Sequence, residues 1–146
     1  MTRVKRARQR GFTLIEIMVV VVIIGLLTAV VTTQVMGRVD DARVNKARRD
    51  IQALGTALEL YRLDNSRYPT TEQGLQALLQ KPTIEPIPHA WKPDGYVARP
   101  SRDPWQKEYI YVSPGQNGGY DLYTLGRDGE EGGEGVDADI SNWTIE

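Results

Sequence analysis

Six acidic side chains are crowded into one glycine-rich stretch near the C-terminus, where they could bind a hard cation. Calcium takes six to eight oxygen ligands from carboxylates and backbone carbonyls, and glycines let the backbone turn its carbonyls inward. The stretch has the length of an EF-hand loop but neither its flanking helices nor its ligand pattern. Because acidic runs are usually solvated, composition alone favours an ordinary surface loop. The six residues are Asp128, Glu130, Glu131, Glu134, Asp137 and Asp139.

A second conspicuous residue is Glu16, the one charge within a long apolar segment. The apolar run continues from Ile17 to Val31, and Gly11 and Phe12 precede it. An ionised carboxylate at membrane depth costs about 3 kcal/mol or more, so it needs a partner. We therefore expect Glu16 to serve a function.

Other constellations that carry enzyme chemistry are absent from the sequence. The chain has no cysteine, which excludes disulfides, a thiol nucleophile and a Cys-ligated zinc site. His89 is the single histidine and lies in a proline-rich stretch, where a surface or loop role is favoured. No nucleophile elbow, phosphate-binding loop or histidine-bearing metal motif occurs. We therefore predict no catalytic residues, and we expect Trp91 and Trp105 to be packing residues or surface anchors.

The charge of the 146-residue chain is distributed asymmetrically. The leader, residues 1–11, carries five basic and no acidic residues. Without those five, thirteen basic side chains remain against nineteen acidic ones, a net charge of about −6. A basic tail alone would suit nucleic-acid binding, but the adjoining apolar run makes membrane topology the better explanation. Lys and Arg stay on the cytoplasmic side of a membrane, so the bulk of the chain should lie on the opposite side. We therefore expect no nucleic acid among its partners.

The elements that position these residues begin with a long helix from about Thr13 to about Leu63. Residues 12–33 would span about 33 Å as a transmembrane and assembly helix, enough for one bilayer crossing. An amphipathic half follows, and its alternative is two helices broken near Gly37. The apolar stripe of this half comprises Val44, Ala47, Ile51, Leu54, Leu58 and Tyr61.

The remaining residues, within a domain that spans 34–146, predict a small α+β unit. A short helix is expected over 71–80, opened by a capping box from Thr70 to Gln73. A proline-rich loop follows over 81–104, with at most a short strand at Tyr96-Val97. A β-hairpin over 108–125 should pack as a small antiparallel sheet against the long helix, and the acidic loop over 126–146 ends the chain.

The N-terminal segment resembles the type IV pilin-like signal, read as Gly11 followed by Phe12-Thr13-Leu14-Ile15-Glu16. The resemblance implies that a prepilin peptidase cuts after Gly11 and methylates the new amine of Phe12. It also implies that Glu16 pairs with the amine of a neighbouring subunit in a helical filament, where the pair neutralises both charges. The alternatives are a signal anchor or a secretory signal peptide, whose small-residue cleavage site is not evident after the apolar run.

Later segments resemble the major pseudopilins of type II secretion systems. They are residues 63–75, Asp103-Pro104-Trp105, residues 120–122, residues 126–129, and residues 139–143. The resemblance implies a pilin-like fold and a structural subunit that polymerises through its N-terminal helix into a fibre that helps export folded proteins across the outer membrane. The alternatives are a minor pseudopilin, a type IV or competence pilin, and, less favoured, a membrane-anchored periplasmic enzyme.

The same resemblance implies the location, the partners and one cofactor. The chain would be a single-pass protein of the bacterial inner membrane, with its N-terminus cytoplasmic and its C-terminal domain periplasmic. Its partners would be further copies of itself, minor pseudopilins, the prepilin peptidase, an inner-membrane assembly platform with its cytoplasmic ATPase, and the membrane before assembly. One calcium ion would bind in the acidic loop, and Glu131 stays an alternative to two of its ligands, Glu134 and Asp137. The expected ligands are the Leu125 carbonyl, Asp128, Glu134, Asp137 and Asp139.

Overall fold

The computed structural model describes residues 11–99 and 102–145, and for residues 29–36 it describes the backbone alone. The predicted leader therefore lies outside the described residues, apart from Gly11. The chain divides into two compact units, Met1–Arg38 and Val39–Glu146.

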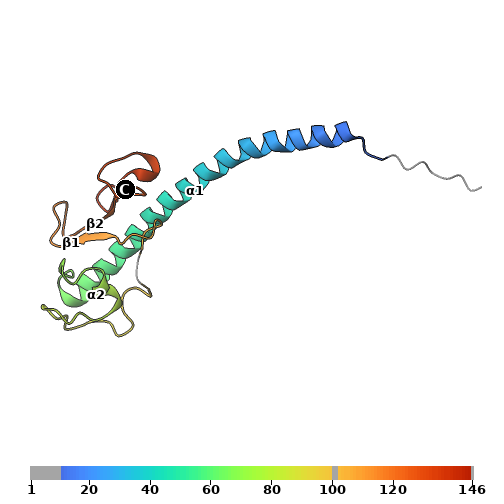
Figure 1. Cartoon of the computed structure of the whole chain (residues 1–146). Helices are drawn as coiled ribbons and strands as arrows, with labels where there is room; N and C mark the ends of the chain where they lie inside the picture. The colour runs from blue at the N-terminus through green and yellow to red at the C-terminus, as the bar shows by residue number, and fades with distance from the viewer. Residues whose placement is uncertain (1–10, 100–101, 146) are drawn as a thin grey trace, which may run out of the picture. The chain divides into compact units, whose positions relative to one another are not determined.

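A single helix, α1, runs from Leu14 to Asn65 (Figure 1). This confirms the prediction of one long helix, and the alternative of two helices broken near Gly37 is wrong. The helix ends because Ser66 adopts a left-handed backbone with φ of 61°. The Ser66 amide donates to the Arg62 carbonyl at 2.7 Å, which satisfies one carbonyl of the last turn.

The core of the C-terminal unit is built on one stripe of α1. Five residues at steps of three or four along the helix are almost completely buried, and Val44 packs beside them. Sheet and α2 residues, among them Leu122 and Leu78, close the core from the other side. The five helix residues are Ala47, Ile51, Leu54, Leu58 and Tyr61.

The sheet that packs on this stripe has three antiparallel strands in the order β1-β2-β3. Strand β1 spans Ile110–Val112, β2 spans Asp121–Thr124 and β3 spans Ile140–Ser141. The predicted hairpin and the α+β class are confirmed, with Tyr111 opposite Leu122. Strand β3 was not expected, and it returns the end of the acidic loop to the sheet, with Thr124 opposite Ile140.

The second helix is shorter than the sequence predicts. Residues 71–75 form turns, and α2 spans only Gln76–Leu79. The reason is Gly74, whose φ of +57° interrupts the helical backbone. The predicted capping box is present, because the Gln73 amide donates to Thr70 Oγ1 at 3.2 Å and the Thr70 amide donates to Gln73 Oε1 at 3.1 Å.

The proline-rich segment forms no strand at Tyr96-Val97. Both backbone N–H groups donate instead to the Leu78 carbonyl, at 2.7 and 3.2 Å, and so hold the loop to the end of α2. Trp91 Nε1 donates to the Ala77 carbonyl at 2.9 Å. This contact agrees with the predicted packing role of Trp91.

A buried carboxylate organises the turn that precedes β1. Asp103, 1% exposed, accepts hydrogen bonds from the backbone N–H groups of Trp105 at 3.0 Å and Lys107 at 2.8 Å. Its second oxygen accepts from the Thr124 hydroxyl at 2.6 Å. The turn is thereby fixed to the last residue of β2, where the acidic loop begins.

Two tyrosine hydroxyls on the sheet side of the core form hydrogen bonds to α1 and to the segment that follows it. Tyr109 Oη donates to Asp50 Oδ2 on α1 at 3.1 Å, and Lys46 pairs with the same carboxylate. Tyr111 Oη donates to the Pro69 carbonyl at 2.7 Å. Burial, followed by the charge of Asp50 and its hydrogen bond, raises the pKa of Tyr109, so the phenol stays neutral when folded.

Replacing Asp103 tests the turn. We expect Asp103→Ala to lower the free energy of unfolding by about 3 kcal/mol, because it leaves three donors without their acceptor, one of them buried and two partly buried. Asp103→Asn should cost about 1 kcal/mol, since the Thr124 hydroxyl can reverse its direction and accept. Urea denaturation of the full chain in detergent measures both. Glu108→Ala is the control, because its side chain is 84% exposed and lies 4.0 Å from Arg102; equal losses in all three variants would contradict the assignment.

Raised tyrosine pKa values predict a loss of stability in alkali. A group with a raised folded pKa stabilises the fold fully below its unfolded pKa, and this stabilisation is lost as the pH rises above about 10. Melting temperature should therefore fall as the pH rises from about 10 toward about 12, the raised pKa of Tyr68 and Tyr96. Tyr109→Phe removes one such group and should make the fall shallower, while Tyr123→Phe, which replaces a half-buried tyrosine, serves for comparison. If the melting temperature of Tyr109→Phe falls with pH as steeply as that of the unmodified chain, Tyr109 does not contribute to the loss of stability in alkali.

Candidate functional site

The predicted cleavage and assembly residues lie at the start of α1. Phe12, two residues before the first residue of the helix, is 80% exposed. Thr13 caps the helix: the Glu16 amide donates to Thr13 Oγ1 at 3.3 Å, and the Thr13 amide donates to Glu16 Oε2 at 3.4 Å. This is a second capping box with the same Thr-x-x-Glu/Gln signature as Thr70 to Gln73. The structure therefore gives Glu16 a contact within its own chain that the sequence analysis missed.

The first turns of α1 expose a surface that is apolar apart from Glu16 and two threonines. Every residue from Phe12 to Thr28 is exposed, and the large apolar side chains among them are 47–82% exposed. Exposure on this scale marks a surface that another molecule or a lipid phase covers. The helices found within the described residues include none with the length and apolarity for a membrane crossing. The predicted span over 12–33 continues into residues whose side chains are not described, and it stays a prediction.

The acidic loop connects β2 to β3 and turns on glycines. Gly126 has a φ of +62°, and a Cβ there would lie 2.7 Å from the carbonyl carbon and oxygen of Asp137. Only glycine therefore permits this close approach of the two ends of the loop. The Arg127 amide donates to the Val136 carbonyl at 3.1 Å, and the Asp139 amide donates to the Gly132 carbonyl at 3.2 Å.

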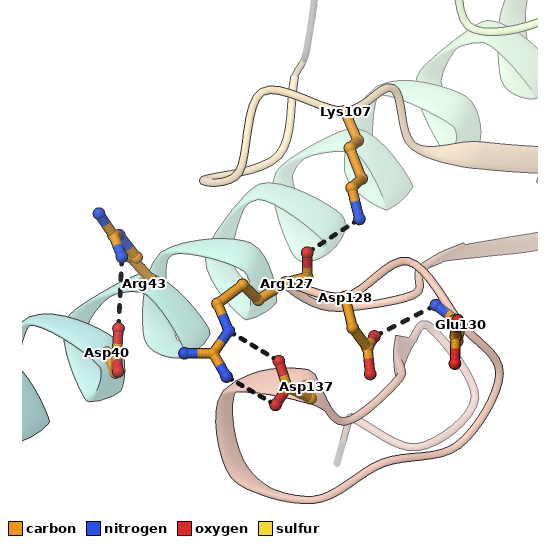
Figure 2. Close-up of polar contacts among 7 residues, drawn as sticks. All are labelled: Asp40, Arg43, Lys107, Arg127, Asp128, Glu130 and Asp137. Carbon is orange, nitrogen blue, oxygen red and sulfur yellow. Dashed lines mark hydrogen bonds and ion pairs between the residues drawn. The ribbon is translucent and has the colours of Figure 1, made fainter.

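The predicted calcium ligands are engaged separately in this loop. Asp137, in the short 3₁₀-helix Gly135–Asp137, pairs with Arg127 through both carboxylate oxygens, at 2.9 and 2.8 Å. Asp128 accepts from the Glu130 amide at 3.1 Å, and Asp139 accepts from the Gly132 amide at 2.9 Å. Figure 2 shows the Arg127 guanidinium facing Asp137 and the carboxylate of Asp128 turned toward Glu130.

In this arrangement the five predicted ligands do not fit one calcium ion. The Leu125 carbonyl accepts from the Gly129 amide at 3.1 Å, and the exposed Glu134 carboxylate forms no recorded hydrogen bond or ion pair within the described residues. Among those residues, no three acidic or histidine side chains converge on a point where a metal could sit. The calcium site thus stays a prediction that this geometry does not support.

Two basic residues form polar contacts in the acidic loop, although the sequence analysis named only acidic side chains and a backbone carbonyl there. Arg127 pairs with Asp137, and Lys107 Nζ donates to the Arg127 carbonyl at 2.9 Å (Figure 2). The hydrogen bonds to Asp137, followed by its negative charge, raise the pKa of Arg127. Arg127 was visible in the sequence as the one basic residue of the tail, whereas Lys107 lies 20 residues before it and carries no local signal.

The end of the loop is fixed by a side chain within the predicted Asp139-Ile140-Ser141-Asn142-Trp143 segment. The Leu122 amide donates to Asn142 Oδ1 at 2.7 Å, and the Asn142 amide donates to the Leu122 carbonyl at 2.9 Å. Trp143 packs edge-on against Tyr123 with ring centroids 5.6 Å apart. The sequence identified this segment by resemblance, but its role in extending the sheet had no signal of its own.

Comparison with known proteins places the chain in one family. Residues 34–143 match the family model described as type II secretion system protein G, and residues 6–32 match that of the prokaryotic N-terminal methylation motif. The type II secretion system core protein G of Pseudomonas aeruginosa is 55% identical over 139 residues, covering 95% of this chain and 98% of the relative. Its counterpart from Vibrio cholerae is 52% identical, covering 97% of each chain.

A solved structure agrees with these matches. The crystal structure of the major pseudopilin from the type 2 secretion system of enterohaemorrhagic Escherichia coli superposes with a TM-score of 0.66 at 46% identity, covering 75% of this chain and 94% of the other. The resemblance inferred from the sequence and the pilin-like fold are both confirmed. The chain belongs to the protein G family of type II secretion systems, the family of their major pseudopilin.

Proposed function

We propose that this chain is the major structural subunit of a type II secretion pseudopilus, assembled through its N-terminal helix. The observation that carries the proposal is the exposed apolar surface of α1 over residues 12–28, interrupted by the single carboxylate of Glu16. A surface that is apolar on every side of a helix is suited to burial in lipid or among other helices. The relatives named as core protein G, with matches over almost the whole chain, favour this function over a minor pseudopilin or a competence pilin.

Processing prepares the helix for assembly. Cleavage between Gly11 and Phe12 would create an ammonium one helical turn before Glu16, in agreement with the methylation motif matched over residues 6–32. Along one helix the carboxylate is poorly placed to reach that amine, and in this structure it faces the Thr13 amide instead. The Phe12 amine of a neighbouring subunit can supply the counter-charge that Glu16 requires inside a filament.

This function sets the location and the partners of the chain. The methylation motif supports a membrane-anchored, pilin-like protein. We infer that it is held in the inner membrane with its C-terminal unit in the periplasm, and that it meets the prepilin peptidase, the assembly platform and minor pseudopilins. An enzymatic role has little support, because the similar proteins are named as core protein G and as a major pseudopilin of the secretion system.

The mass and N-terminal sequence of the chain purified from its own membranes test the processing step. We expect a start at Phe12 with one added methyl group. A start at Met1 would make the segment a plain signal anchor. A start beyond Val31 would make the chain a secreted protein, and either result would overturn the filament assignment.

Substitutions of Glu16 test the charge pairing. Filament yield should fall by about two orders of magnitude in Glu16→Ala, because an unpaired buried ammonium costs roughly 3–5 kcal/mol. Glu16→Gln separates the two roles of the residue, since an amide still caps Thr13 but carries no charge. We expect Glu16→Gln to reduce the filament yield as much as Glu16→Ala does, as measured by sedimentation of assembled filaments. The exposed Glu72→Ala should assemble normally; normal filaments from Glu16→Gln would show that the cap, and not the charge, is what assembly needs.

A further inference from the structure

The turn between β1 and β2 contains an asparagine that is followed directly by glycine. Asn117 and Gly118 are both exposed. The Asn117 amide donates to Asp121 Oδ1 at 3.0 Å, and its side-chain nitrogen Nδ2 donates to Asp121 Oδ2 at 3.2 Å. One buried carboxylate, which is 6% exposed, therefore holds both the backbone and the side chain of Asn117.

The atoms through which an asparagine loses its side-chain nitrogen are unengaged in this turn. In that reaction the next backbone nitrogen attacks the side-chain carbonyl carbon. A glycine in the next position favours the attack, because it has no Cβ and its backbone adopts a wide range of angles. The Gly118 amide donates no hydrogen bond within the described residues, and Asn117 Oδ1 accepts none there. Both the attacking nitrogen and the carbonyl group that it must reach are thus available.

The other three asparagines of the chain are protected by their surroundings. Asn45 lies within α1, where the following amide belongs to the hydrogen bonding of the helix. The side chain of Asn65 is hydrogen bonded through its oxygen and its nitrogen, and the amide of the following Ser66 donates to a helix carbonyl at 2.7 Å. Asn142 is likewise bonded at both side-chain atoms and precedes a tryptophan. The structure therefore distinguishes Asn117 from the other asparagines.

We propose that Asn117 is a modification site, at which the side-chain amide is converted to a carboxylate without an enzyme. The Gly118 nitrogen forms a bond to Cγ of Asn117, the bond between Cγ and Nδ2 breaks, and the proton of the Gly118 amide leaves with Nδ2 as ammonia. Water then opens the cyclic imide. Cleavage between Cγ and the Gly118 nitrogen gives aspartate, and cleavage between the main-chain carbonyl carbon and that nitrogen gives isoaspartate. The reaction depends on this turn alone and is separate from filament assembly.

The product disturbs the turn that Asp121 organises. The oxygen that replaces Nδ2 lies beside Asp121 Oδ2, so a hydrogen bond of 3.2 Å is lost and two negative charges face each other. The Gln116 amide donates to the same carboxylate at 2.9 Å and depends on the same arrangement. Conversion of Asn117 therefore loosens the connection between β1 and β2.

The first test follows the loss of ammonia in the full-length chain, kept folded in detergent at mildly alkaline pH. Peptide mass spectrometry measures, for each asparagine, the fraction in which the NH₂ group has been replaced by OH. Asn117 should react at least about tenfold faster than Asn45, Asn65 and Asn142, a ratio that corresponds to about 1.4 kcal/mol in the activation barrier. No reaction at Asn117, or a rate there no higher than at the other three, would overturn the proposal.

Gly118→Ala is the matched variant, because the turn has room for it. A Cβ at Gly118 would approach no atom more closely than the Tyr120 carbonyl oxygen at 4.0 Å, and the Gly118 backbone is not left-handed. The fold should stay intact while the methyl group hinders the attacking nitrogen, so the rate at Asn117 should fall at least about tenfold. Gly119 is unsuitable, since a Cβ there would lie 2.6 Å from the Tyr68 ring. An unchanged rate in Gly118→Ala would contradict attack by the Gly118 nitrogen.

The second test imitates the product. Asn117→Asp adds the carboxylate, whereas Asn117→Ala removes the same side-chain hydrogen bond without adding a charge. The melting temperature of Asn117→Asp should lie below that of Asn117→Ala, because the aspartate alone places a second negative charge beside Asp121. Equal melting temperatures, or a higher one for Asn117→Asp, would show that the modification does not disturb the turn.

Discussion

The burial of one stripe of α1 is the interaction on which the C-terminal unit depends. Ala47, Ile51 and Leu58 are at most 1% exposed, and the sheet and α2 pack against them. The fully buried side chains of Ile51 and Leu58 each contribute about 1.5–3 kcal/mol relative to exposure, before the entropy of ordering is subtracted. With three short strands and a four-residue second helix, the rest of the unit has little other structure to bury. The long helix therefore organises the sheet.

Two parts of the same helix meet different surroundings. In the stretch from Ala47 to Tyr61, apolar residues recur on one stripe and charged residues occupy the exposed face, as expected for a helix with a core on one side and water on the other. From Leu14 to Thr28 all residues are exposed, and almost all are apolar. That pattern stabilises nothing within one chain, so its stabilisation must come from neighbours. Intrachain packing and assembly are thus assigned to successive parts of one element.

Features carried by local signals could be predicted, and features that depend on distant partners could not. The capping box from Thr70 to Gln73 and the β-hairpin followed from spacing and turn residues. The Thr13–Glu16 box has the same signature, but its glutamate also belongs to the assembly motif, and spacing alone does not separate the two roles. Strand β3 has two residues, too few for a periodic pattern. The contact between Lys107 and Arg127 depends on the turn built around Asp103, which no local pattern encodes.

The acidic side chains of the two candidate sites differ in how their charge is balanced. Asp137 finds its counter-charge in Arg127 of the same loop, and the pair is partly exposed, so its contribution lies more in geometry than in energy. Within the described residues, the Glu16 carboxylate accepts a hydrogen bond from the Thr13 amide at 3.4 Å, which caps a helix but does not neutralise a carboxylate. In water this is sufficient, because solvent supplies the remaining stabilisation. In the proposed filament the apolar surface around Glu16 would be buried and that solvent lost, so the carboxylate would need a positive group from another chain. A carboxylate therefore has its counter-charge within the same loop at Asp137, whereas at Glu16, in the proposed filament, the counter-charge would come from a second molecule.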